Sequence, residues 1–213
     1  MKSNEQLVRD LARDLEPVKL LPRLRALWAA ALGLWALGIV GSMWLGGTAW
    51  PSHHAWEMPS YGGIFVALGA VGIGGLLGLA SAVPGRERLA RFGTAVCLLG
   101  SLIALGIGAS VGWGHPRHLS AATDGACLAR SVLLSLLPVG VLLGFLARGF
   151  APNLGLSSWL GVSAALGLGA LAALAMCPWA EGLHLFAAHS AGPLLAALLL
   201  AAPAALWLRQ RSA

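Results

Sequence analysis

Long apolar stretches separated by short polar segments dominate this chain of 213 residues. Six of the stretches are long enough to cross a bilayer core of about 30 Å, which takes about 20 helical residues. They lie at approximately 26–46, 61–83, 92–113, 127–147, 155–176 and 184–208. Because lipid offers no partner for an unpaired backbone group, each stretch is expected to be helical. The pattern predicts an all-α membrane protein built as a six-helix transmembrane bundle.

A different pattern occupies the start of the chain, where charged residues interrupt a helical repeat of apolar ones. Leu7, Val8, Leu11 and Leu15 recur at helical spacing, and Pro17 ends the repeat. An isolated helix of about 12 residues is marginal in water, so this apolar stripe is expected to dock on another surface. The inner leaflet of the membrane and a groove on a cytoplasmic protein are the two candidates. The mixed charge of the segment favours the protein.

Composition and charge support a membrane location and an orientation. Charged residues make up only 10% of the chain, against about 25% in soluble domains. Basic residues cluster before the first span, between the second and third, after the fourth and after the sixth. By the positive-inside rule these segments are cytoplasmic, so we expect both termini in the cytoplasm. The net charge of +6 follows from this asymmetry and does not indicate direct nucleic-acid binding.

The chain therefore divides into a cytoplasmic amphipathic segment at 1–25, a transmembrane bundle at 26–208 and a short cytoplasmic tail at 209–213. The first span is expected to remain in the mature protein, because polar residues precede it and its apolar run exceeds that of a secretion signal. No feature of the sequence decides whether the bundle self-associates.

The interiors of the spans contain almost no ionisable residues. Arg130 lies near one end of the fourth span, where its side chain can reach the interface. Transporters usually keep ionisable groups near the midplane, so the scarcity of such groups argues against one. A small metal or solute transporter is the alternative interpretation. Enzyme motifs such as a nucleophile elbow or a phosphate loop do not occur, and an enzyme is not expected. Glycines four residues apart instead predict close helix packing, as in the pairs Gly74 with Gly78 and Gly108 with Gly112.

Two cysteines are placed so that the fold should bring them together. Cys127 opens the fourth span and Cys177 closes the fifth, and the two legs have similar lengths and a short connection, so both sulfurs should return to one depth. They could form a disulfide, or they could bind a soft divalent metal together with His184 and His189. Further possible donors are Glu181 and Asp124.

The histidine pair poses a geometric difficulty for such a site. His184 and His189 are five positions apart, so on one regular α-helix their side chains would diverge by about 140°. A metal site built on that pair alone is expected to be strained. The remaining cysteine, Cys97, has no apparent partner and is expected to be a buried apolar residue.

Three segments, in order, resemble a known family. They are "LVRDLARDLEPVKLLPRLRALW" near the N-terminus, "CLARSVLLSLLPVGVLLGFLARG" in the fourth span and "MCPWAEGLHLFAAHSAG" before the sixth. Together they resemble the NrsF family of bacterial six-span inner-membrane anti-sigma factors, and the plan is similar to that of CarR-type light-responsive anti-sigma factors. The resemblance implies a multi-pass protein of the bacterial inner membrane whose cytoplasmic N-terminus sequesters an extracytoplasmic-function sigma factor.

The resemblance also implies roles for individual residues. Cys127 and Cys177 correspond to the two outward-facing cysteines that take part in sensing, and His189 corresponds to a histidine that follows the second of them. The expected signal is an oxidant, light-generated singlet oxygen or a heavy metal. The expected partners are the sigma factor and membrane lipid. The residues expected to contact the sigma factor are Leu7, Val8, Leu11 and Leu15.

Overall fold

The computed structural model describes residues 5–6, 23–46, 59–114, 121–148, 153–177 and 182–212. Within these ranges the chain is helical and contains no strand. The α-helices are α2 (Leu24–Gly46), α4 (Pro59–Gly78), α5 (Glu87–Gly114), α6 (Ala121–Leu146), α7 (Leu154–Ala175), α8 (Gly182–His184) and α9 (Gly192–Ser212). A 3-10 turn, η1 (Leu79–Ala82), extends α4, and a π-helix, η2 (Leu185–Ala191), joins α8 to α9.

Among the described residues, six helical segments are long and apolar enough to cross a membrane, as in a multi-pass membrane protein. They cover Leu24–Gly41, Pro59–Ala82, Glu87–Trp113, Thr123–Leu146, Leu154–Ala175 and Gly182–Arg211. Each overlaps one of the six stretches that the hydropathy pattern predicts. In the part of the chain that the structure describes, the all-α fold class is therefore confirmed, and six helices have the length and apolar composition that the predicted bundle requires.

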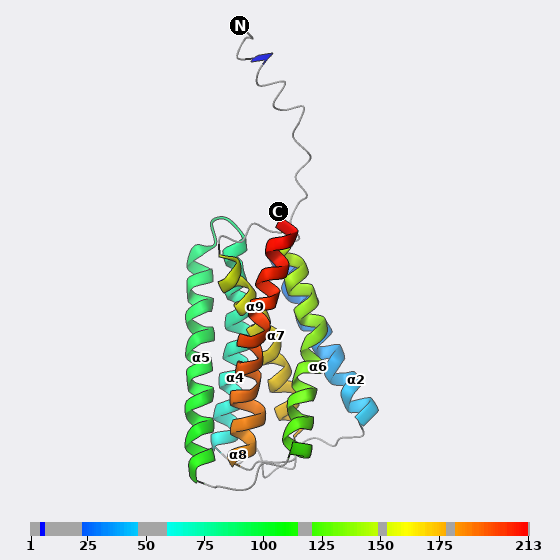
Figure 1. Ribbon diagram of the computed structural model, residues 1–213, viewed down its shortest axis with the longest axis vertical. Helices are drawn as coiled ribbons and strands as arrows, with labels where there is room; N and C mark the ends of the chain where they lie inside the picture. Colours follow the sequence, from blue (N-terminus) through cyan, green and yellow to red (C-terminus); the bar gives the residue numbers. More distant parts are fainter. Residues whose placement is uncertain are drawn as a thin grey trace.

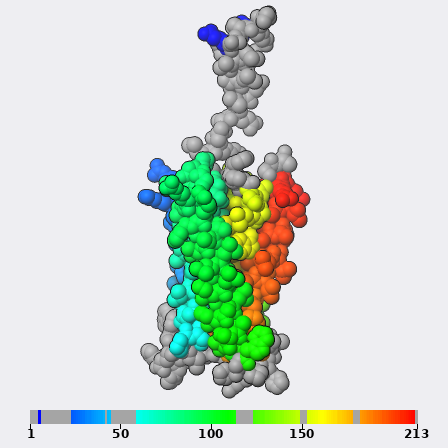
Figure 2. Space-filling model, turned by 90° about the vertical axis from the view of Figure 1, so that its left-hand side faces the viewer, coloured from blue at the N-terminus to red at the C-terminus, as the bar shows by residue number. Residues whose placement is uncertain are grey.

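The bundle is built around α7. In the span of α7, 83% of the residues are buried, whereas in the span of α2 only 11% are. Helices α4, α6 and α9 all pack against α7, and α5 packs against α4 and η2. Figure 1 shows α2 on the outside of the bundle, next to α6. Figure 2 shows a long face on which α5 runs between α4 and α9. The least buried span is thus the one that follows the N-terminal segment.

The two ends of the bundle differ in charge. In Figure 1, α2 begins and α9 ends at one end, and the turn between α4 and α5 and the end of α6 lie there too. That end carries every basic residue of the described ranges except Arg130. They are Arg23, Arg25, Arg86, Arg88, Arg91, Arg148, Arg209 and Arg211.

Glycines allow several of these helices to approach closely. A Cβ on Gly74 would lie 2.5 Å from the backbone nitrogen of Cys97 in α5. A Cβ on Gly108 would lie 2.7 Å from Oγ of Ser190 in η2. Real side chains essentially never come so near, so these contacts require glycine. The close packing predicted from the glycine spacing is confirmed at these two positions.

Two tryptophans attach the exposed helix α2 to the rest of the bundle. The indole of Trp28 donates a hydrogen bond to the carbonyl oxygen of Leu76 in α4, at 3.1 Å. The indole of Trp35 donates to the carbonyl oxygen of Leu168 in α7, at 2.6 Å. A donor buried against apolar helices needs such a partner, so these bonds fix where α2 sits.

Candidate metal centre

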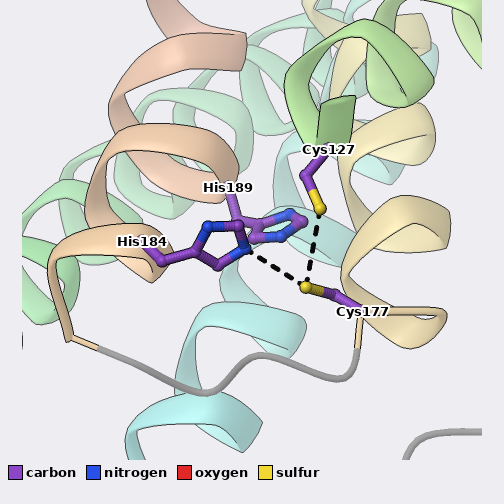
Figure 3. Close-up of side chains that lie close together, drawn as sticks. All are labelled: Cys127, Cys177, His184 and His189. Atoms are coloured by element: carbon purple, nitrogen blue, oxygen red, sulfur yellow. Dashed lines mark hydrogen bonds between the residues drawn. The ribbon is translucent and has the colours of Figure 1, made fainter. Parts of the chain in front are cut away.

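Four side chains that could bind a metal meet at the end of the bundle where α8 lies (Figures 1 and 3). Cys127 comes from the second turn of α6, and Cys177 follows the last residues of α7. His184 ends α8, and His189 lies inside η2. One donor atom from each residue lies within 4.8 Å of all the others. Three separate parts of the chain therefore contribute to one Cys2His2 cluster.

The spacing of the donors suits a single tetrahedral ion. The two sulfurs lie 3.6 Å apart, and Nε2 of His184 lies 3.2 Å from Sγ of Cys177. Zinc binds sulfur at about 2.3 Å and imidazole nitrogen at about 2.0–2.1 Å, so its ligand atoms are about 3.6–3.8 Å apart in a tetrahedron. Shifts of a few tenths of an ångström would bring these two pairs to that spacing. Both cysteines are free thiols, and the matched lengths of the two legs correctly predict their proximity.

A carboxylate outside the cluster orients one of the histidines. Asp124, one turn before Cys127, accepts a hydrogen bond from Nδ1 of His184. That bond places the ring proton on Nδ1 and leaves the lone pair of Nε2 facing Cys177. Metal-bound histidines commonly use their second nitrogen in this way, which fixes the tautomer and the ring orientation. His184 is thus presented as a ligand.

The other histidine is fully buried, and within the described part of the chain its two ring nitrogens are unsatisfied. His189 has no exposed surface, and neither of its ring nitrogens has a hydrogen-bond partner among the described residues. Burying an unsatisfied polar group costs about 1–3 kcal/mol, so such groups are rare unless something else binds them. A metal ion held by the two sulfurs and His184 would coordinate one nitrogen of His189. The donor set and this unsatisfied ring therefore fit a soft or borderline divalent metal.

The divergence expected for His184 and His189 on one regular α-helix does not occur, because the two residues do not lie on one. The ring centroids of His184 and His189 lie 5.1 Å apart, with the ring planes at 73°. The reason is that η2 is a π-helix, in which the amide of Gly192 donates to the carbonyl oxygen of Ala187, five positions earlier. In that register, residues five apart lie one turn above each other and share a face. The 140° divergence applies only to a regular α-helix.

Hydrogen bonds between helices hold the two cysteines in place. Oγ of Ser135 in α6 donates to the carbonyl oxygen of Ala165 in α7, at 3.0 Å. At the end of α7, the carbonyl oxygen of Leu174 accepts from the amide of Cys177, at 3.0 Å, and from the hydroxyl of Tyr61 in α4. The bonds at Leu174 tie α4 to the end of α7 beside Cys177, and the bond from Ser135 ties α6 to α7 about two turns along α6 from Cys127.

The structure brings together Cys127, Cys177, His184 and His189, which are the possible metal ligands that the sequence suggests. Asp124 acts as a hydrogen-bond acceptor for His184 instead of joining the four donors. Cys97 is buried in the main core, as expected of an apolar residue. Glu181 and the residues expected to contact the sigma factor, Leu7, Val8, Leu11 and Leu15, lie outside the described residues. Near them, Glu5 and Gln6 are helical and exposed.

No family model, curated protein or solved structure matches the chain. The resemblance to the NrsF family therefore rests on the three segments quoted above.

Proposed function

We propose that this protein is a membrane-bound anti-sigma factor of the bacterial inner membrane. Its cytoplasmic N-terminal segment binds an extracytoplasmic-function sigma factor, and a signal at the Cys2His2 cluster releases that sigma factor. The signal we favour is a soft or borderline divalent metal, since two thiolates and two imidazoles match its ligand preference. An oxidant acting on Cys127 and Cys177 is the other input open to the same thiols.

The observation that carries this proposal is the position of the cluster. Four donors with little exposure lie at the end of the bundle opposite the basic end, and the donors come from three separate parts of the chain. With the basic end in the cytoplasm, the cluster faces the outside of the cell. A ligand bound there bridges α6, α7 and the α8–η2 segment, so it can change how these helices pack.

The binding energy of such a site is large enough to drive a switch. Shifting two conformations from 1:99 to 99:1 takes about 5.5 kcal/mol of differential binding. Structural zinc sites in small peptides supply about 10–16 kcal/mol at neutral pH. The switch therefore needs only part of the free energy of metal binding, acting through a change in how α6 packs.

Two helices packed against each other connect the cluster to the sigma-binding segment at the opposite end of the bundle. Cys127 lies in α6, and α2 packs along α6. Since α2 begins directly after the N-terminal segment, a shift of α6 moves the attachment point of that segment. In this proposal, the signal reaches the cytoplasmic segment through α6 and α2 alone.

The transporter alternative receives no support from the two buried serines of α6. Ser131 and Ser135 are the polar side chains of α6 that follow Cys127 toward the core. The hydroxyl of Ser131 donates to the carbonyl oxygen of Cys127, and that of Ser135 donates to carbonyl oxygens in α6 and α7. Hydroxyls engaged with the backbone do not form a polar path for a transported ion.

The proposal is tested by purifying the full-length protein, and a variant lacking residues 1–20, from membranes of its own bacterium and identifying the bound proteins by mass spectrometry. A sigma factor is expected with the full-length protein alone. Adding Zn²⁺ or Cd²⁺ to the washed complex should then release it. Recovery of no sigma factor with the intact N-terminus would overturn the proposal.

A matched pair of cysteine variants tests the role of the cluster. The double variant Cys127→Ser, Cys177→Ser should hold its sigma factor at every metal concentration, because serine is a poor ligand for soft metals. Cys97→Ser, which changes a cysteine of the main core, should respond as the wild type does. A normal metal response in the double variant would rule out the cluster as the sensor.

A further inference from the structure

The π-helix η2 lies within the sixth span, at the metal cluster. Residues Leu185–Ala191 form it, between the α-helical segments α8 and α9. No other described residue is in a π-helix. Such turns are rare, and they occur mostly as short bulges at functional sites. The departure from α-helix here is the feature that places His189 beside His184.

The two residues that directly follow η2, Gly192 and Pro193, explain why the helix widens there. Pro193 has no amide proton, and in a regular α-helix its ring would clash with the carbonyl oxygen of His189, four positions earlier. The wider register avoids that clash. The amide of Gly192 closes the π-turn on Ala187, and a Cβ on Gly192 would lie 2.5 Å from that same carbonyl oxygen. Proline and glycine in succession thus make the π register accessible.

The two registers differ in what they offer the cluster. In the π register, His184 and His189 share a face and both rings reach the cysteines (Figure 3). In the α register, the ring of His189 turns away by about 100°, which is the rotation of one residue. Within the described residues, the π register leaves both buried ring nitrogens of His189 without a hydrogen bond, which a bound metal would relieve at one of them.

We infer that η2 is a register switch that the cluster controls. A metal bound by Cys127, Cys177, His184 and His189 holds the π register, and its loss lets the span return to a continuous α-helix. This inference rests on the proposed function, since it takes the metal as the ligand. The return to α-helix turns α9 relative to α8 by about 100° and shifts it by about 1.5 Å along its axis.

The far end of α9 shares a buried apolar cluster with α2. Leu208 of α9 is 1% exposed and belongs to the same buried cluster as Leu27 and Ala31 of α2. His189 and Leu208 are separated by 19 positions, about 28 Å along a helix at about 1.5 Å per residue. A rotation that starts at the metal site therefore changes the packing beneath the helix that follows the sigma-binding segment.

Deleting Ala187 separates metal binding from switching. The deletion removes the extra residue of the π-turn and leaves the two histidines four positions apart, on one face of a regular α-helix. Zinc binding should therefore persist, while the change of register is lost. We expect the variant to bind Zn²⁺ with near wild-type affinity in competition with a chelator. Its α9 should keep the orientation that the zinc-bound wild type has, with or without zinc.

The orientation of α9 is measured at Trp207, by fluorine NMR of the full-length protein labelled with 5-fluorotryptophan. This residue is 39% exposed and lies on α9 far from the cluster, so zinc cannot perturb it directly. Its resonance is assigned with Trp207→Phe. Zinc should shift this resonance in the wild type and leave it fixed in the deletion variant, at the zinc-bound position. An equal zinc-dependent shift in both proteins, or none in the wild type, overturns the switch.

Pro193→Ala provides the complementary test. Alanine restores the amide and removes the ring clash, so the α register is favoured and the binding-competent fraction falls. The apparent zinc affinity should drop by about tenfold or more. Adding the Ala187 deletion to Pro193→Ala should restore binding, which a merely misfolded variant would not do. Wild-type affinity in Pro193→Ala overturns the assigned role of the proline.

These measurements use purified protein and zinc alone, so they are independent of any sigma factor. If no sigma factor co-purifies, the proposed function fails, while the fluorine resonance of Trp207 still decides whether the register switch exists. If sigma release is normal in the Ala187 deletion, the switch fails while the anti-sigma function stands.

Discussion

Asp124 and His184 are 60 positions apart in the chain, yet the carboxylate of the first accepts the Nδ1 proton of the second. The bond joins the first turn of α6 to the end of α8. It therefore links two of the three chain segments of the cluster through Asp124, which is not one of the four possible ligands. Asp124 acts on the cluster only through His184.

Replacing Asp124 with asparagine should weaken metal binding while the four ligands remain. Asparagine keeps the size of the side chain but loses the charge, and it can present its amide group to His184 and disturb the ring orientation. Loss of such an outer hydrogen-bond partner typically costs about 10–100-fold in metal affinity. Competition between the purified protein and a zinc chelator measures the change.

Asp124→Glu should recover part of the affinity, because the carboxylate is retained at a longer reach. Glu87→Gln is the matched control, since Glu87 begins α5 and its carboxylate accepts from the amide of Gly85. That variant should bind zinc normally. The absorption spectrum of bound Co²⁺ reports the ligand geometry, and an Asp124→Asn spectrum and affinity identical to wild type would show that the carboxylate has no positioning role.

A glycine in α7 sets the distance between the two helices that carry the cysteines. A Cβ on Gly169 would overlap Oγ of Ser135 and the carbonyl oxygen of Ser131, both in α6. Gly169→Ala should therefore push α6 from α7, lower stability by about 1–3 kcal/mol and weaken zinc binding by separating the sulfurs. Thermal unfolding in detergent and chelator competition measure the two effects.

Gly140→Ala, also in the bundle, is the control for that substitution, because no atom lies within 4 Å of its Cβ position. It should be neutral or slightly stabilising, as alanine is the better helix former. If both glycine variants behave alike, the close contact at Gly169 does not set the cysteine spacing.

The sequence was sufficient to predict the large-scale features of this fold. Membrane helices must satisfy their own backbone, so apolar length alone locates them, and the six spans appear where hydropathy predicts them. The shared depth of Cys127 and Cys177 follows from the same regularity, because two legs of similar length joined by a short turn end at one level.

What the sequence did not predict is the departure from regularity at the cluster. On a regular α-helix the side chains of His184 and His189 would point in different directions. In the π-helix η2 they lie side by side. The signal was present in Gly192 and Pro193, since a proline near the start of a span disturbs the preceding turn. The pairing of Asp124 with His184 depends on the packing of α6 against this turn, which no local pattern encodes.

The attachment of α2 should influence signalling without affecting the metal site. Trp35→Phe removes the indole donor that reaches Leu168, so it should lower stability by about 0.5–1.5 kcal/mol. Zinc affinity should stay unchanged, because no ligand lies on α2, while metal-dependent sigma release becomes weaker. Trp44→Phe is the control, as Trp44 is 87% exposed on the same helix. A loss of zinc affinity in Trp35→Phe would instead mean that α2 supports the cluster.

The N-terminal stripe provides the most direct test of what the protein binds. Leu11→Asp places a carboxylate in the centre of the apolar stripe, where docking would bury it without a partner. If the stripe enters a groove on the sigma factor, affinity should fall by about 30-fold or more, as expected for a central interface residue worth about 2 kcal/mol. Transcription from the sigma-dependent promoter should then be constitutive. Gln6→Glu adds the same charge at an exposed position and should leave repression intact. Continued repression by Leu11→Asp would mean that the stripe is not the docking surface, and that the sigma factor is held by another part of the cytoplasmic end.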